Sequence, residues 1–165
     1  METSRLSLQD VKTGTFDYHR DKRGEIFTTY KDSHNCISFR HDKVAIRKYN
    51  CLVGIHGDFT ATKLVTCLFG TVFCAVVDVR IGSKDYNKHK TFVLSGENKK
   101  YALIPPGVGN SFYVQSEVCV YNYKLAYQGD YPDVNDQFTL RWNDPIYGID
   151  WPCENPLLSD RDSFS

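Results

Sequence analysis

The apolar positions of this chain are grouped in short runs, and the two strongest runs lie near the middle of the sequence. Residues 63–68 (KLVTCL) and 71–80 (TVFCAVVDVR) are rich in β-branched and apolar residues, and Phe69-Gly70 separates them. Runs of this length and composition are typical of strands, and a two-residue separator with a glycine is compatible with a hairpin turn. We therefore expect these two strands to pair as a hairpin.

Further short apolar runs follow, at residues 91–95, 101–104, 111–115 and 117–127, and Gly, Pro, Asn and Ser separate them. Short strands with turns at such intervals are typical of an all-β sandwich or barrel. No segment has the periodicity of a long amphipathic helix, and no repeat or low-complexity linker divides the chain. The pattern predicts one all-β domain over residues 1–165 with few short helices.

The run at residues 117–127 has a regular alternation of side chains. In a strand, alternate positions share a face, and here one face carries Cys119, Tyr121, Tyr123, Leu125 and Tyr127. Buried tyrosines need polar partners for their hydroxyls. The row is therefore compatible with a face packed on a second sheet and equally with the wall of a ligand cavity inside a barrel.

Charge and composition exclude several classes of partner. Twenty basic residues balance twenty acidic ones, so the chain lacks the overall positive field that binding to nucleic acid relies on. Any anionic ligand must be held by a local cluster of cations. No stretch approaches the roughly 20 apolar residues that span a bilayer. We expect no nucleic-acid or membrane partner.

The cysteines favour a reducing compartment. There are six of them: Cys36, Cys51, Cys67, Cys74, Cys119 and Cys153. Three lie inside apolar runs, where free cysteine behaves as a small buried hydrophobe. The N-terminal residues show no apolar signal-peptide core. We therefore expect reduced thiols and a cytoplasmic protein.

One histidine has an unusual setting. His56 lies between Gly54 and Gly57 after an apolar run, and glycines allow a ligand or a second backbone to come close. From the residues alone, His56 is either structural or an active-site base. The other histidines (His19, His34, His41 and His89) are scattered. None forms the close His-x-His pair common in metal-binding barrels, so we expect no metal site.

Several short motifs, taken in order, resemble the dTDP-4-keto-6-deoxyglucose 3,5-epimerase family of rhamnose biosynthesis. Residues 21–24 (DKRG) match the family's Asp-x-Arg-Gly, and residues 52–56 (LVGIH) match its Leu-Arg-Gly-Leu-His. The later matches are KLV at 63–65, VDVR at 77–80, IPPG at 104–107, YK at 123–124, WND at 142–144 and GIDWP at 148–152. Each motif is short, but the ordered set covers residues 16–162. The resemblance implies a cupin-type jelly-roll β-sandwich that uses no metal or redox cofactor.

Within that family the chain is most similar to the branch that acts on GDP-activated 4-keto heptoses in polysaccharide synthesis. The motifs HDK (41–43), IHGD (55–58), GN (109–110) and DQFT (136–139) carry this likeness. Thr28 stands where the rhamnose enzymes have a glutamate that faces thymine. That difference fits a base other than thymine.

The resemblance also implies roles for individual residues. His56 matches the general base and Asp162 the carboxylate that orients it. Lys63 matches the lysine near the sugar carbonyl, and Tyr123 the tyrosine on the opposite face of the sugar. Tyr121 shares a strand face with Tyr123, and we expect it to contact the substrate.

Further matches concern substrate binding. Arg23 matches an arginine that contacts the nucleotide, and Asp78 a buried cavity carboxylate. Asn110 replaces a histidine of the rhamnose enzymes, as in the heptose branch. Val53 replaces an arginine that binds the pyrophosphate. The chain thereby loses a guanidinium group, which is always charged and can make two parallel hydrogen bonds. We expect either weaker binding of the diphosphate or a transfer of that role to Lys43, Arg47 or Lys48.

These residue types suit proton transfer beside a ketone. A histidine has a pKa near working pH, a carboxylate can fix its tautomer, and a lysine can stabilise a developing enolate. We expect epimerisation at carbon 3, and also carbon 5, of a nucleotide-diphosphate 4-keto sugar. The alternatives are a 3,4-ketoisomerase, which should carry a close histidine pair, and a non-catalytic sugar-nucleotide-binding cupin, which Val53 favours. The resemblance further implies a homodimer that shares its N-terminal strand.

Overall fold

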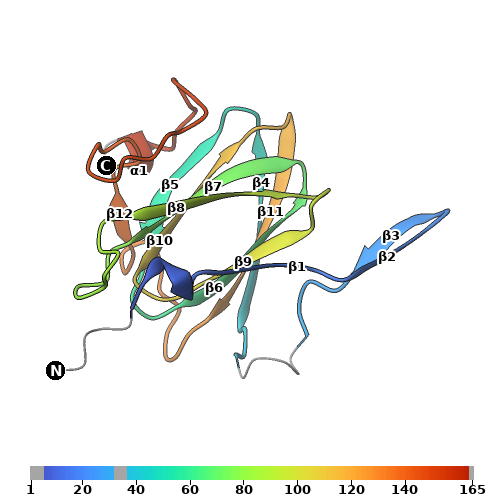
Figure 1. Ribbon diagram of the computed structural model, residues 1–165, viewed down its shortest axis with the longest axis horizontal. Helices are drawn as coiled ribbons and strands as arrows, with labels where there is room; N and C mark the ends of the chain where they lie inside the picture. Colours follow the sequence, from blue (N-terminus) through green and yellow to red (C-terminus); the bar gives the residue numbers. More distant parts are fainter. Residues whose placement is uncertain (1–5, 32–36, 164–165) are drawn as a thin grey trace.

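The protein, described in a computed structural model for residues 6–31 and 37–163, is built almost entirely of β-strands (Figure 1). The strands are β1 (Lys12–Thr15), β2 (Tyr18–Asp21), β3 (Gly24–Phe27), β4 (His41–Lys48), β5 (Leu52–Gly57), β6 (Thr62–Phe69), β7 (Thr71–Asp78), β8 (His89–Ser95), β9 (Lys100–Ile104), β10 (Val108–Val114), β11 (Val118–Ala126) and β12 (Phe138–Leu140). Helical structure in the described residues is limited to a 3₁₀ turn, η1 (Leu8–Asp10), and the short helix α1 (Asp160–Ser163).

Ten of these strands form two five-stranded antiparallel sheets. One has the order β1-β9-β6-β11-β4, and the other β12-β5-β10-β7-β8. Apolar side chains from both sheets meet in one buried core, in which Val65, Val76 and Ile104 are completely buried. The predicted all-β fold is confirmed as a jelly-roll β-sandwich of the cupin type.

The predicted hairpin at Phe69-Gly70 is wrong. Strands flank Gly70 as expected, but β6 pairs with β9 and β11, whereas β7 pairs with β8 and β10 in the other sheet. Gly70 is therefore a corner between the sheets, with φ +81° and only 2.2 Å between an added Cβ and the Val118 carbonyl oxygen. The residues of a turn do not determine which distant strands pair with the two strands that flank it.

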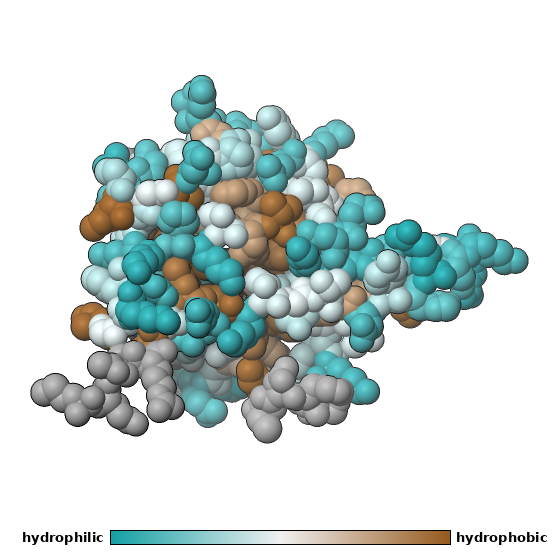
Figure 2. All heavy atoms as spheres, in the orientation of Figure 1, coloured by the Kyte–Doolittle hydropathy of each residue, from teal (hydrophilic) through white to brown (hydrophobic). Residues whose placement is uncertain are grey.

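The charged motif near the N-terminus forms the tip of a hairpin. Strands β2 and β3 pair from Tyr18–Phe27 to Asp21–Gly24, and they project away from the sandwich (Figure 1). The surface of this projection is mostly hydrophilic in Figure 2. Its base is fixed by Lys99, whose Nζ lies 2.6 Å from Glu25 Oε1 and 4.8 Å from the centre of the Tyr18 ring.

The structure bears on the expectations about cysteines and membrane spans only for the residues that it describes. All five cysteines of the described residues are free, three of them buried; Cys36 and His34 lie outside the described residues. No helix in the described ranges is long and apolar enough to cross a bilayer.

Candidate active site

A cavity of ≈490 Å³ opens between the two sheets, next to the C-terminal segment. We call it the central cavity. Strands β4, β6 and β11 supply one wall, and β5 and β10 the other. Seven of the predicted site residues line it: Lys43, His56, Lys63, Asn110, Tyr121, Tyr123 and Asp162. Of the alternating row on β11, Tyr121, Tyr123 and Leu125 line this cavity, so this part of the strand face is a cavity wall.

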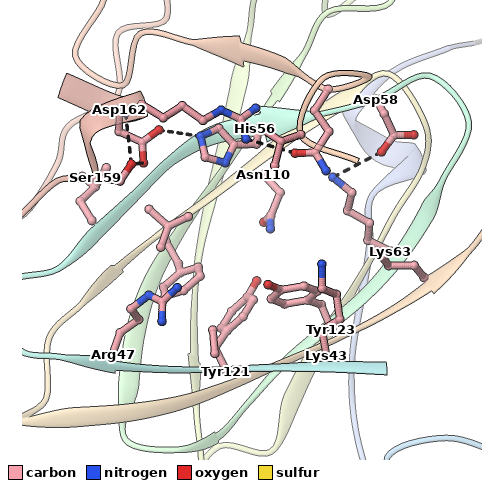
Figure 3. A pocket seen from close by; sticks show the side chains of 18 of the residues that line it. Lys43, Arg47, His56, Asp58, Lys63, Asn110, Tyr121, Tyr123, Ser159 and Asp162 are labelled. Atoms are coloured by element: carbon pink, nitrogen blue, oxygen red, sulfur yellow. Dashed lines mark hydrogen bonds and ion pairs between the residues drawn. The ribbon is translucent and has the colours of Figure 1, made fainter. Parts of the chain in front are cut away.

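His56, which is partly exposed, and the buried Asp162 form a pair at one side of the central cavity (Figure 3). His56 Nε2 lies 2.6 Å from Asp162 Oδ1, and Asp162 also accepts hydrogen bonds from the Gly54 backbone N–H and the Ser159 hydroxyl. Burial raises the pKa of Asp162, but these hydrogen bonds, first that from His56, outweigh burial and leave its pKa below the usual value. Asp162 is therefore an ionised acceptor, so Nε2 carries the proton and the lone pair of Nδ1 is left to act as a base.

The glycine before His56 has a structural reason. An added Cβ on Gly54 would lie 2.1 Å from Asp162 Oδ1. Only glycine lets the carboxylate reach both the strand backbone and the histidine ring. Asp162 comes 106 residues after His56 along the chain. Gly54 and Asp162 thus act together to hold the histidine ring in place.

Lys63 enters the central cavity from β6. Its side chain is 13% exposed, and Nζ lies 3.8 Å from Asp58 Oδ2. Burial lowers the pKa of Lys63, and the negative charge of Asp58 opposes that effect without cancelling it. Asp58 is itself fixed by the backbone N–H groups of Thr60 and Ala61. Lys63 is a positioned amine with little water around it.

Three buried polar atoms in the described residues have no hydrogen-bond partner, and all belong to side chains that line the central cavity. They are Asn110 Oδ1, the Tyr121 hydroxyl and Arg161 Nη2. Buried polar groups are normally hydrogen-bonded, so such a group needs an explanation. Their concentration in one place is what a cavity shaped for a polar ligand would show.

The charged groups of the cavity wall give it a positive charge. The cations are Lys43, Arg47, Lys63 and Arg161, and the carboxylates are Asp58 and Asp162. Four positive and two negative charges leave a net +2 before His56 is counted. Val53 lines the same wall without adding charge, while Lys48 is not part of the lining. The cavity fits a dianion, and of the three proposed substitute cations only Lys43 and Arg47 reach it.

Arg161 is a cavity residue that sequence reasoning missed. Its Nε donates to Thr139 Oγ1 at 2.7 Å, and Nη1 lies 3.4 Å from Gln137 Oε1. Nothing local in the charged tail shows that it folds back on β12. Its position next to Asp162 was the available signal.

Asp78 does not line the central cavity, so the structure gives no support to its predicted substrate contact. It is completely buried and accepts hydrogen bonds from Arg80 at 2.7 and 2.9 Å and from Ser83 Oγ at 2.7 Å. Arg80 also pairs with Asp10 near the N-terminus. This network joins the end of β7 to the N-terminal segment, and its role is structural.

Asp78→Asn should therefore destabilise the fold without removing the ligand site. Breaking a buried ion pair on one side costs about 3–5 kcal/mol, which a denaturant titration would measure. Asp21→Asn, at the exposed hairpin tip, is the control and should change the stability little. Normal stability together with lost ligand binding would instead make Asp78 a binding residue.

Arg23 also lies outside the central cavity of its own chain. It is at the tip of the β2–β3 hairpin, its side chain is 83% exposed, and its guanidinium pairs with Asp21 at 2.5 Å. Within one chain, Arg23 therefore does not meet the other predicted residues.

The jelly-roll sandwich, its positively charged cavity and the His56–Asp162 pair fit a cupin-type enzyme with an anionic substrate, and comparison with known proteins identifies the family. The model for dTDP-4-dehydrorhamnose 3,5-epimerase matches residues 5–164. The chain belongs to this family. It is 33% identical to the dTDP-4-dehydrorhamnose 3,5-epimerase of Pseudomonas aeruginosa over 98% of this chain and 93% of that protein.

Solved structures agree with this assignment. The dTDP-6-deoxy-D-glucose-3,5-epimerase of Legionella pneumophila, solved with dTDP-4-keto-L-rhamnose, has a TM-score of 0.89 at 30% identity and covers 97% of this chain and 88% of its own. A 3′-monoepimerase from Streptomyces bikiniensis, solved with dTDP-quinovose, has a TM-score of 0.86 at 26% identity. The match covers 97% of this chain and 84% of that one. The similar structures thus include a one-centre and a two-centre enzyme.

Proposed function

We propose that this protein inverts carbon 3, and also carbon 5, of a nucleotide-diphosphate-linked 4-keto sugar. The observation that carries the proposal is the His56–Asp162 pair, with 2.6 Å between Nε2 and Oδ1, on a cavity that also holds Lys63 and Tyr123. A hydrogen next to a ketone is acidic enough for a histidine to remove when the enolate is stabilised. A purely binding protein would need no such oriented base.

The proposed reaction uses only side chains of the cavity. His56 Nδ1 takes the proton from the carbon next to the carbonyl, and the electron pair moves to the carbonyl oxygen. Asp162 stabilises the resulting imidazolium, and Lys63 stabilises the enolate charge. Tyr123 then gives its hydroxyl proton to the opposite face of the same carbon, which completes the inversion. Exchange with water returns a proton to Tyr123 and removes one from His56.

The cavity cations would bind the diphosphate in place of the arginine that Val53 replaces. Arg47 is the best placed, because it lines the cavity and its guanidinium donates to the Ile46 backbone carbonyl rather than to a carboxylate of the described residues. Lys43 contacts the Tyr131 hydroxyl and lies 4.7 Å from that ring centre. Both are on β4, opposite the wall that holds His56.

Arg47→Met should weaken binding of a nucleoside diphosphate by about ten- to a hundredfold, the value of a lost charge-assisted hydrogen bond. Lys48→Met is the matched control: it removes a cation from the next position of β4 that does not reach the cavity. Isothermal titration calorimetry measures both. An equal effect of the two substitutions would show that only overall charge matters.

We further propose a GDP-4-keto heptose or a dTDP-4-keto-6-deoxyhexose as substrate, in cytoplasmic synthesis of polysaccharide sugars. The relatives' names favour dTDP, whereas Thr28 and the motifs of the heptose branch favour GDP. Incubation with 4-keto sugars carried on each nucleotide, followed by NMR of the products, tests the proposal. Unchanged configuration at carbons 3 and 5 with every sugar would refute it.

A homodimer would explain why Arg23 is so far from its own cavity. The hairpin projects from the sandwich (Figure 1), and the edge strand β4 exposes Val44 and Ile46, 56% and 64%. In a dimer the hairpin of one copy can reach the cavity of the other and bring Arg23 and Thr28 to the nucleotide. Light scattering coupled to gel filtration measures the mass.

A further inference from the structure

The deep end of the central cavity holds two unsatisfied polar groups that the proposed reaction does not use. The Tyr121 hydroxyl is on a completely buried side chain of β11, and Asn110 Oδ1 is on β10, in register with His56 on β5. Figure 3 shows Asn110 and Tyr121 pointing into the cavity from opposite walls. Neither atom has a hydrogen-bond partner among the described residues.

The surroundings of Tyr121 keep its hydroxyl where it is. Its ring stacks on Phe112 with the centres 4.1 Å apart and the planes 17° apart. Burial raises the pKa of Tyr121 well above its ordinary value, so the hydroxyl stays neutral and can both donate and accept. The Asn110 side chain and the buried Cys74 thiol both lie near this hydroxyl, but neither makes a hydrogen bond of normal geometry with it, and a thiol is only a weak hydrogen-bonding group.

The pair therefore matches one kind of ligand group. Asn110 Oδ1 accepts a hydrogen bond and the Tyr121 hydroxyl can donate one. A single alcohol, which donates one hydrogen bond and accepts another, would satisfy both atoms. A methyl group in the same place would leave both unsatisfied, and buried unsatisfied polar groups are strongly unfavourable.

The direction in which the substrate enters identifies that alcohol. Arg47 is exposed and Lys43 half-buried, so the phosphates bind near the mouth, while Tyr121 marks the deep end. A sugar joined to the diphosphate through carbon 1 points carbon 4 and the arm on carbon 5 inward. Lys63 takes the carbonyl at carbon 4 in the proposed reaction. The arm on carbon 5 is left to face Asn110 and Tyr121.

We infer that Asn110 and Tyr121 select a sugar whose arm on carbon 5 carries a hydroxyl, against a 6-deoxy sugar that ends in a methyl. This inference rests on the proposed function, which it deepens by naming the substrate class. It makes the two residues determinants of specificity rather than of proton transfer.

The test is equilibrium binding of ligand pairs that differ only in the hydroxyl on carbon 6. Suitable pairs are dTDP-glucose with dTDP-quinovose and GDP-mannose with GDP-6-deoxymannose, measured by calorimetry. Within the pair that the wild-type protein binds, we expect the Kd of the hydroxylated ligand to be about tenfold lower than that of the 6-deoxy ligand. This ratio equals about 1.4 kcal/mol of binding free energy. Tyr121→Phe, which keeps the stacked ring, should reduce this ratio to near one by weakening only the hydroxylated ligand.

Tyr127→Phe is the matched control. Tyr127 directly follows the end of β11 and does not line the cavity, so loss of its hydroxyl should leave the ratio unchanged. Equal affinity of wild-type protein for both members of a pair, or an unchanged ratio in Tyr121→Phe, overturns the inference and leaves the proposed function standing. Absence of proton exchange in a bound 4-keto sugar overturns the proposed function, whatever the ratio.

Discussion

His56→Asn should reduce epimerisation at least 100- to 10,000-fold, the usual contribution of a positioned base. The asparagine side chain overlays the Nδ1 half of the imidazole and stops short of the Nε2 position, while Asp162 stays held by the Gly54 N–H and the Ser159 hydroxyl. Asparagine has no group that accepts a proton near neutral pH. The rate of product formation, followed by NMR, gives the effect directly.

His89→Asn is the matched control for that loss. His89 Nδ1 lies 2.6 Å from the Tyr147 carbonyl oxygen, outside the central cavity, and asparagine can donate the same hydrogen bond. Activity in this variant should be near the wild-type value. If His56→Asn keeps more than a tenth of the wild-type rate while folded, another group is the base.

Tyr123→Phe should separate proton removal from inversion. The substitution removes one oxygen and no ring volume, so Tyr123 keeps its packing beside Tyr121, whose ring centre is 5.9 Å away. His56 should still remove the proton and return one to the same face, whereas delivery to the opposite face should fail. In deuterated water, deuterium should enter carbon 3 while inverted product falls by about 100-fold or more.

The two signals come from one NMR experiment, so the outcomes are easy to tell apart. Equal loss of exchange and inversion would make Tyr123 a positioning residue. Full retention of both would move the acid to Tyr121 or to water. A stronger loss at carbon 5 than at carbon 3 would show that the second centre depends more on this hydroxyl.

Much of the fold could be predicted because its signals are local. The runs at 91–95, 101–104, 111–115 and 117–127 became β8 to β11 with small changes of boundary. Strand pairing was not predictable in the same way. The corner at Gly70 carried the same turn residues as a hairpin, and only contacts with β9 and β8 place its two arms in different sheets.

The site was predictable only where a motif named its residues. The resemblance predicted that His56, Lys63, Tyr123 and Asp162 share a site. All four line the central cavity, although they are spread over much of the chain. Asp78 belonged to a matching motif, VDVR, yet the neighbouring Arg80 holds it in a structural network. Arg161 had no motif, because its place depends on how the C-terminal segment folds back.

Exchange of solvent deuterium tests the central claim most directly. The wild-type protein would be incubated in deuterated water with the 4-keto sugar nucleotide it binds, and proton NMR would follow each carbon of the sugar. The account predicts that the signals of carbon 3, and then carbon 5, disappear while those of carbons 1 and 2 persist, and that His56→Asn prevents the loss. Persistence of the hydrogens at carbons 3 and 5 in a bound 4-keto sugar would contradict it.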